Sequence, residues 1–259
     1  MKKIFLLLFS LSFVVSVFSQ NKTKAGEAFY MLDEDFKGTA QEKAVYFIHT
    51  VKIHDSCWQF DTYNIFGPII SSEQYKDEKG TEASGMFCYY NKKGKMDSSG
   101  NYLNGFQNGS WYFINDTGRY YLQKDYSAGK LINIKDIIGI DSIKKRMENT
   151  TRKSATEEVE VEADFVGGQS RWIYYLGKNM TYPERALKAD KQGTVVVQFI
   201  IDPDGNVALP EILQSVEYSL DQEAMRLIKN SPTWKPSVQN GKNVKAYKIQ
   251  PVTFRFESN

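Results

Sequence analysis

The sequence is poor in the residues that most often build catalytic and metal sites. Its 259 residues include only two histidines, two cysteines and seven prolines, and the formal net charge is +2. This low net charge argues against a general nucleic-acid binder, which would carry a concentrated basic surface. His49 and His54 lie on one expected strand at positions that face opposite sides, so they do not readily share a metal ion. The prolines form no run that could serve as an extended spacer.

Other patterns that could support chemistry are incomplete. His54-Asp55-Ser56-Cys57 has the residue types of a nucleophilic site, but adjacency in sequence does not make a catalytic triad. Asp202-x-Asp204-x-Asn206 is similar to a calcium loop, although Val207 stands where such a loop needs glycine. We therefore expect a protein that is not an enzyme and that needs no cofactor or metal ion.

The first segment predicts export from the cytoplasm. A basic start, Met1-Lys2-Lys3, precedes an almost unbroken apolar run over 4–18, and Val17-Phe18-Ser19 suits a signal peptidase. We expect residues 1–19 to be a cleaved signal peptide, which places the mature chain in the periplasm or cell envelope. The alternative is an uncleaved inner-membrane anchor, although the run is shorter than the ~20 residues that span a bilayer comfortably.

The two cysteines are compatible with an exported protein, but the sequence does not show whether they form a disulfide. No cysteine lies near the cleavage point, so a lipoprotein anchor is not expected. An oxidising periplasm would permit a disulfide between Cys57 and Cys88. Two buried thiols are the alternative, because sequence does not show whether the side chains meet.

Residues 20–149 form a β-rich region, expected from its tyrosines, phenylalanines and glycines. It contains an internal repeat, in which each unit predicts two strands joined by a glycine-containing turn such as Asn115-Asp116-Thr117-Gly118. The residue pairs that share an offset of 24 positions are Gly85 and Gly109, Phe87 and Trp111, Tyr89 and Phe113, Asn91 and Asn115, Gly94 and Gly118, Tyr102 and Tyr126, and Gly105 and Gly129.

The clearest part of this region, residues 84–130, resembles the MORN repeat and its bacterial relatives. The resemblance rests on Gly100-Asn101-Tyr102-Leu103-Asn104-Gly105 and Gly109-Ser110-Trp111-Tyr112-Phe113. It implies an elongated, all-β stack of hairpins that buries aromatic side chains between neighbours. Such a region is a scaffold without chemistry, or it presents Trp111, Tyr112 and Tyr126 to a partner.

Two connecting segments follow the repeats. Residues 134–149 mix apolar and charged side chains and predict a short helix, which Gly139 weakens. Residues 150–163 contain four glutamates, and a charge run of this kind indicates a solvated acidic linker.

Residues 164–259 carry the pattern of a small α+β domain. The two central strands meet at Asp202-Pro203-Asp204-Gly205, which is a strong hairpin turn. The expected order is helix, strand, strand, helix, strand, over 171–176 and the segment from Pro183, 194–201, 207–215, the segment from Ser219, and 244–256.

Two local details of this domain follow from residue types. Ser219 and Gln222 fit a capping box at the start of an amphipathic helix. In the last strand, Tyr247 and Ile249 share one phase of the alternation, whereas Val252 belongs to the other. We therefore expect a bulge at Gln250-Pro251.

Nearly the whole of 164–259 resembles the C-terminal domain of TonB, in the variant common among Bacteroidetes-type envelope proteins. One departure is Phe165-Val166-Gly167-Gly168, where relatives often have proline before the two glycines. The residues that carry the resemblance are Tyr182-Pro183-x-Arg185-Ala186, Gly193-x-Val195-x-Val197-x-Phe199, Asp204-Gly205-x-Val207, Leu220-Asp221-x-Glu223-Ala224, Trp234-x-Pro236, Asn240-Gly241-Lys242 and Pro251-Val252-x-Phe254.

The resemblance implies a non-enzymatic binding module in TonB-dependent transmembrane transport. Family members hold a short extended segment of an outer-membrane receptor as an added strand, and an exposed edge strand is a ready template for such pairing. We expect Lys248 and Gln250 to face the partner, an outer-membrane receptor or another envelope protein. The full set of expected contact residues is Tyr247, Lys248, Ile249, Gln250, Val252, Asn179 and Tyr182.

Two alternatives remain open. A TonB energy transducer is anchored in the inner membrane and crosses the periplasm on a Pro-rich spacer, whereas this chain has an expected folded repeat and lacks the intramembrane histidine. The first alternative is a transducer retained by an uncleaved N-terminal segment. The second is a structural scaffold that binds through the MORN-like repeats, with the TonB-like domain forming a homodimer.

Overall fold

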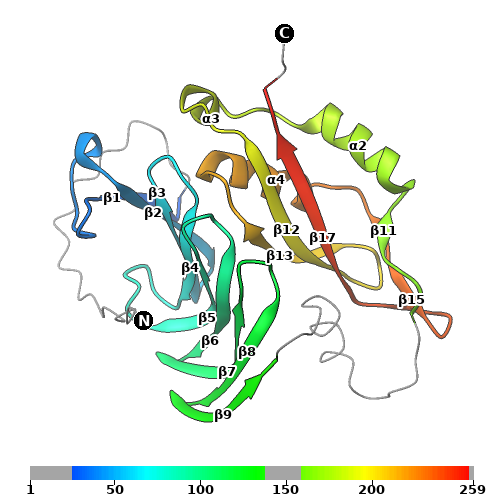
Figure 1. Cartoon of the computed structure of the whole chain (residues 1–259), viewed down its shortest axis with the longest axis horizontal. Helices are drawn as coiled ribbons and strands as arrows, with labels where there is room; N and C mark the ends of the chain where they lie inside the picture. Colours follow the sequence, from blue (N-terminus) through cyan, green and yellow to red (C-terminus); the bar gives the residue numbers. More distant parts are fainter. Residues whose placement is uncertain (1–24, 138–158, 257–259) are drawn as a thin grey trace.

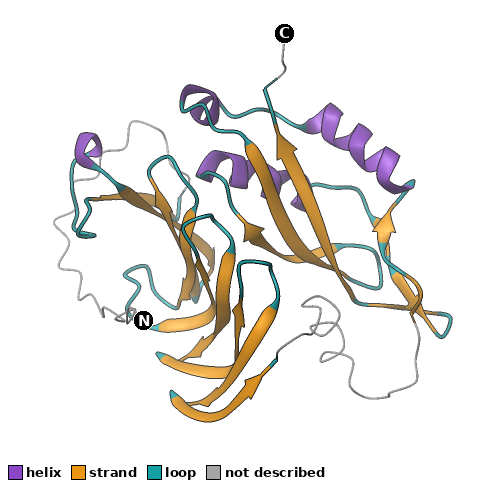
Figure 2. Ribbon diagram, in the orientation of Figure 1, coloured by secondary structure: helices purple, strands orange, loops and turns teal. Residues whose placement is uncertain are grey.

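The computed structural model describes residues 25–137 and 159–256. A large antiparallel sheet occupies the first part of the chain and a smaller α+β part follows, as the sequence predicts. Helix α4 (Tyr218–Lys229) lies between the two sheets (Figure 1). Figure 2 shows that strands dominate both parts and that the longer helices belong to the second.

The first part is an antiparallel meander in which each described strand pairs with the next one along the chain, β1 to β9. The elongated sheet predicted from the repeats is therefore present. A single 3-10 turn, η1 (Gln41–Lys43), interrupts the link from β1 to β2. The strands are β1 (Glu27–Leu32), β2 (Tyr46–His54), β3 (Cys57–Asn64), β4 (Ile69–Tyr75), β5 (Ala83–Tyr90), β6 (Met96–Leu103), β7 (Phe106–Ile114), β8 (Tyr120–Ser127) and β9 (Lys130–Asp136).

The 24-residue offset in the sequence is also present in the backbone. The Asn91 N–H donates to the Lys95 carbonyl oxygen at 2.9 Å. The Asn115 N–H donates to the Arg119 carbonyl oxygen at the same distance, 24 positions later. In both turns the asparagine Oδ1 also accepts backbone N–H groups two and four residues on, which explains why asparagine recurs there. The assignment to MORN repeats stays a prediction.

Several aromatic side chains of the repeat are buried against one another on the large sheet rather than exposed to solvent. Trp111 is buried and packs edge-to-face against Tyr102, and its Nε1 donates to the Asn101 carbonyl oxygen at 3.2 Å. The prediction that Trp111 is presented to a partner is therefore wrong. Tyr112 and Tyr126 are half-buried.

Several expectations for the rest of the chain change or lie outside the described residues. Residues 134–136 belong to β9 rather than to a helix, and 138–149 are outside. The end of the expected acidic linker forms β10 (Val159–Val161), which pairs with β15 (Ser237–Gln239). The signal-peptide residues also lie outside, and no helix among the described residues is long and apolar enough to cross a membrane.

The two cysteines do not form a disulfide. Cys57 on β3 is a partly exposed thiol, and Cys88 on β5 is a buried one. The disulfide that an oxidising compartment would permit is therefore absent, and only Cys88 matches the buried-thiol alternative.

The second part follows the predicted order of helix, strand, strand, helix, strand. A three-stranded antiparallel sheet has the order β13-β12-β17. The remaining short strands pair as β10-β15-β16 and β11-β14. The elements not yet given are β11 (Asp164–Phe165), α2 (Gly168–Asn179), α3 (Glu184–Lys188), β12 (Gly193–Ile201), β13 (Val207–Gln214), β14 (Trp234–Lys235), β16 (Lys242–Val244) and β17 (Ala246–Phe254).

The predicted central hairpin is confirmed. The side chains of alternate residues on β12 are fully buried, from Val195 to Ile201. In the turn, the Gly205 N–H donates to the Asp202 carbonyl oxygen at 2.9 Å, and Gly205 has φ 84°. A Cβ at Gly205 would lie 2.2 Å from the Trp234 carbonyl oxygen, so the close approach also requires glycine.

Two local predictions for this part are wrong. Glu217, not Ser219, caps α4, because the Glu217 carboxylate accepts the Ser219 N–H at 2.9 Å. The pairing of β17 with β12 is continuous from Ala246 to Phe254, with no bulge at Gln250-Pro251. Tyr247 and Ile249 lie on the outer face of the sheet, whereas Val252 is buried on the opposite face. Regular alternation along β17 accounts for both positions without a bulge.

A buried polar cluster joins the two parts of the molecule. Asp221 of α4 is fully buried, and its Oδ2 accepts hydrogen bonds from Tyr63 Oη at 3.1 Å and Ser215 Oγ at 2.5 Å. Ser215 Oγ in turn accepts the Ile69 N–H at 2.9 Å. Burial raises the pKa of Asp221 to about 7. Because Tyr63 and Ile69 belong to β3 and β4, directed hydrogen bonds tie the large sheet to α4.

Arg185 of α3 makes a second connection between the parts. Its guanidinium pairs with the fully buried carboxylate of Glu217 at 2.5 Å and also donates to the Ile65 carbonyl oxygen. The rings of Phe47 and Phe66 lie 5.2 and 5.1 Å from the guanidinium carbon, within the range of cation–π contact. Three of these four partners belong to the first part, so Arg185 fixes α3 against the large sheet.

The β5–β6 turn covers the end of one outer strand of the small sheet. The Ser215 N–H donates to the Gly94 carbonyl oxygen at 2.8 Å, and Lys95 forms an isolated bridge with Gln214 at the end of β13. Gly94 has φ 73°, and a Cβ there would lie 2.4 Å from the Ser215 carbonyl oxygen. The repeat region therefore occupies the β13 side of the small sheet and leaves the β17 side to other contacts.

Candidate functional site

The candidate site is the outer edge of β17. Among the described strands β17 has one neighbour, β12, and the pairing between them is regular over nine residues. On the other side of β17, helix α2 rather than another strand lies beside the second half of the strand (Figure 1). A strand edge that no other described strand covers is a template for strand addition.

The direction of the backbone groups on β17 follows from two observations. Pro251 has no N–H, and a proline within a sheet is tolerated where its nitrogen faces away from the neighbouring strand. Thr253 shares that direction, and its Oγ1 lies 3.0 Å from Oγ1 of the paired Thr194, a closeness typical of pairs whose backbone groups point outward. It follows that Ile249 and Thr253 direct their N–H and C=O groups to the open edge, with a donor missing at Pro251.

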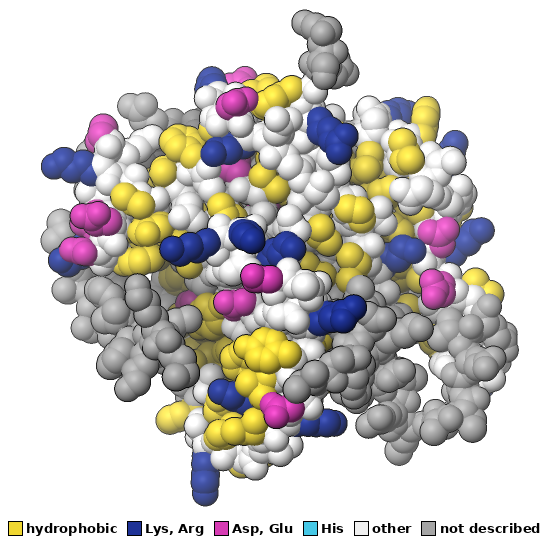
Figure 3. All heavy atoms as spheres, in the orientation of Figure 1, with side chains coloured by type: hydrophobic (Ala, Val, Ile, Leu, Met, Phe, Trp, Pro, Cys, Tyr) yellow, Lys and Arg dark blue, Asp and Glu magenta, His cyan; other side chains and the backbone are white. Residues whose placement is uncertain are grey.

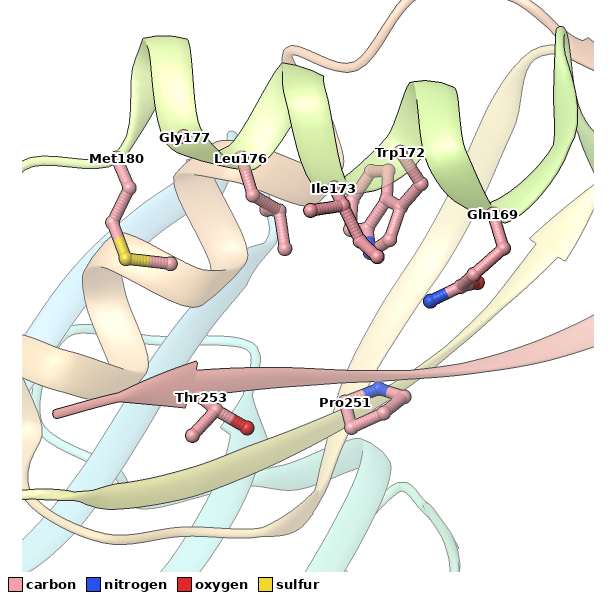
Figure 4. Close-up of a pocket in the computed structure, with 8 residues that line it drawn as sticks. All are labelled: Gln169, Trp172, Ile173, Leu176, Gly177, Met180, Pro251 and Thr253. Carbon is pink, nitrogen blue, oxygen red and sulfur yellow. The ribbon is translucent and has the colours of Figure 1, made fainter.

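A groove of about 400 Å³ runs between α2 and this edge (Figure 4). Side chains of α2 point toward β17 across the groove, and most of them are apolar. The residues that line it include Gln169, Trp172, Ile173, Leu176, Met180, Pro251 and Thr253.

The wall formed by α2 is held in place from behind. Trp172 is 1% exposed and packs against Phe165 and Trp234, with ring centroids 5.2 and 5.4 Å away. Tyr175 Oη donates to the Leu227 carbonyl oxygen at 2.9 Å, which fastens the middle of α2 to the end of α4. The groove therefore has two fixed sides, a helix and a strand edge.

The surface around the groove is mixed in character. Figure 3 shows hydrophobic side chains exposed where α2 and β17 lie, with Lys and Arg side chains nearby. Ile173, one of the apolar lining residues, is 60% exposed. An exposed apolar strip beside an open backbone edge suits an extended peptide better than a small polar ligand.

The residues predicted on β17 are only partly directed to this groove. Lys248 Nζ donates to the Ala163 carbonyl oxygen at 2.9 Å. This side chain therefore connects the first half of β17 to the segment that precedes β11. Gln250 is 6% exposed and Val252 is fully buried, so both face the core. The expectation that Lys248 and Gln250 face a partner is therefore wrong for their side chains. Tyr247 and Ile249 lie on the outer face.

Asn179 and Tyr182 border the site without lining the groove. Asn179 is the last residue of α2, and its Nδ2 donates to the Tyr175 carbonyl oxygen at 2.7 Å. Tyr182 Oη donates to the Lys191 carbonyl oxygen at 2.5 Å, and its ring packs edge-to-face on Phe254. Both residues shape the end of the site.

Sequence reasoning missed the α2 side of the groove. Trp172, Leu176 and Met180 recur at intervals of four, which predicts one face of a helix longer than 171–176. The pattern would have indicated that face, but not that it lies across from the last strand. That juxtaposition depends on the packing of Trp172 in the core.

The second part is therefore a small α+β domain with an open sheet edge beside a groove. Residues 178–256 match the family model described as the Gram-negative bacterial TonB protein C-terminal, which supports the predicted TonB-type domain. The match covers less than half of the chain and includes α3 through β17 but only the end of α2. No curated protein and no solved structure matches the chain.

Proposed function

We propose that this protein binds an extended segment of an outer-membrane TonB-dependent receptor by adding it as a strand to β17. The observation that carries the proposal is the open edge of β17, which lies within the residues that match the TonB C-terminal family. An apolar groove runs beside this edge, and most of its α2 side precedes the matched residues. The protein acts as a non-enzymatic component of TonB-dependent transport.

The two sides of the groove contribute differently to recognition, β17 through its backbone and α2 through its side chains. Outward backbone groups at Ile249 and Thr253 pair with the main chain of the added segment, which gives affinity with little dependence on sequence. Alternate side chains of that segment lie against the apolar face of α2, at Leu176 and Met180, which gives specificity for aliphatic residues.

The expected signal peptide supports a location where such a segment is accessible, because it would direct the chain to the periplasm or cell envelope. The folded repeat takes the place of a Pro-rich spacer, so we do not assign the chain the role of an energy transducer.

One variant pair tests strand addition directly. Thr253→Pro deletes an outward donor at the groove, whereas Thr253→Val keeps the N–H and removes only the hydroxyl. The probes are overlapping peptides from the periplasmic N-terminal segments of outer-membrane receptors, titrated into the mature chain from Gln20. We expect Thr253→Pro to weaken binding at least tenfold, about 1.4 kcal/mol, and Thr253→Val to change it less than threefold. Circular dichroism confirms the fold of each variant, and equal binding by both would refute strand addition here.

A scaffold function has one specific observation in its favour. Exposed apolar side chains lie on β6, β7 and β9 of the large sheet, at Leu103, Phe106, Leu131, Ile132 and Ile134. Replacing Phe106 and Ile132 by serine separates the two functions, because a scaffold loses its partners while receptor peptides still bind the groove. If envelope proteins are lost with these variants and peptides never bind, the repeat region is the binding part.

A further inference from the structure

The groove contains one buried hydrogen-bond donor without an acceptor among the described residues. Trp172 is 1% exposed, and no acceptor lies within hydrogen-bonding distance of its Nε1. The other two buried indoles are satisfied: Trp111 donates to the Asn101 carbonyl oxygen and Trp234 donates to Ser231 Oγ at 2.9 Å. Buried tryptophans normally find such a partner, so Trp172 is an exception that calls for a cause.

The position of this donor points to a ligand. Trp172 lines the groove, and in the close-up its indole lies on the inner side of α2 with the nitrogen toward β17 (Figure 4). A strand that adds to β17 directs half of its carbonyl oxygens to β17 and the other half away, toward α2. Apart from the Gln169 amide, the α2 wall is apolar, so outer carbonyls that do not reach Gln169 would otherwise lack a donor, which is costly when water is excluded.

We propose that Trp172 Nε1 donates a hydrogen bond to a backbone carbonyl of the segment bound in the groove. This inference rests on the proposed function and adds a positioning contact from α2 to the pairing with β17. The indole is well suited to the task because Phe165 and Trp234 hold its ring in place before binding. One fixed donor also sets the register of the added strand, because a shift by one residue turns the carbonyl away.

The test compares two substitutions of the same kind in the mature chain. Trp172→Phe keeps an aromatic ring in the packing and removes the donor, whereas Trp111→Phe does the same in the repeat region. The probe is the tightest-binding peptide from the receptor-segment titrations. We expect Trp172→Phe to bind about tenfold more weakly, which is about 1.4 kcal/mol, and Trp111→Phe to bind as the unmodified chain does.

A spectroscopic measurement on the unsubstituted chain tests the same contact without depending on the folding of a variant. In a ¹⁵N-labelled chain, we expect the indole N–H resonance of Trp172 to move downfield and its hydrogen exchange to slow when the peptide saturates the groove. A peptide that binds without moving this resonance, with Trp172→Phe binding equally well, overturns the inference and leaves strand addition standing. If no receptor peptide binds at any concentration, the proposed function fails, and this contact fails with it.

Discussion

Gly94 offers the sharpest test of how the two parts of the molecule are joined. It stands at positive φ in the β5–β6 turn, and a Cβ there would lie 2.4 Å from the Ser215 carbonyl oxygen and 2.7 Å from Pro68 Cβ. Gly118 is its equivalent 24 positions later, also at positive φ, but a Cβ there meets no atom within 4 Å. Both substitutions to alanine place a Cβ on left-handed backbone, which costs about 1–2 kcal/mol in each case.

The difference between the two variants isolates the contact between the parts. The clash at Gly94 involves backbone and adds about 1–3 kcal/mol. It also displaces the hydrogen bond from the Ser215 N–H, worth about 1 kcal/mol. We therefore expect Gly94→Ala to lower the free energy of unfolding by about 2–4 kcal/mol more than Gly118→Ala, combining these two effects. Urea unfolding followed by tryptophan fluorescence measures the free energy of unfolding of both variants. Equal decreases would show that the β5–β6 turn does not stabilise the protein through its contact with the end of β13.

Two further predictions concern the buried charges between the parts. Burial raises the pKa of Asp221 to about 7, above the unfolded value of 3.8, so folding takes up a proton between these values. The contribution of Asp221 to the free energy of unfolding is therefore complete below pH 4. It falls by about 4 kcal/mol as the pH rises to about 7. Asp221→Asn should flatten the dependence of the urea midpoint on pH between pH 5 and 8. Arg185→Met leaves Glu217 buried without its cation and should cost about 3–5 kcal/mol. Adding Glu217→Gln should restore part of that loss in a double-mutant cycle, and no recovery would contradict the pairing.

The features that sequence predicted correctly are those that local chemistry determines. The Asp202–Gly205 hairpin follows from a turn whose residues each have a physical reason, and the alternation from Val195 to Ile201 marks a fully buried face. The repeat offset was visible because the same asparagine turn recurs. These signals do not depend on what packs against them.

The features that sequence missed depend on partners far away in the chain. Tyr63 and Asp221 are 158 positions apart, and nothing near either residue indicates that they meet. The sequence predicts a bulge because Tyr247 and Ile249 share one phase of the alternation and Val252 the other. In the structure that face of β17 is the outer one, and the groove with α2 arises from the packing of Trp172. Glu217 caps α4 because its carboxylate is already held there by Arg185.

The central claim is that a partner segment pairs with the outer edge of β17. Hydrogen–deuterium exchange of the chain from Gln20, with and without the tightest-binding receptor peptide, tests this residue by residue. We expect the amide protons of Ile249 and Thr253 to become strongly protected when the peptide is bound, while those of β13 do not change. Protection that appears on β9 or β13, or binding that leaves both β17 amides in rapid exchange, would contradict the account.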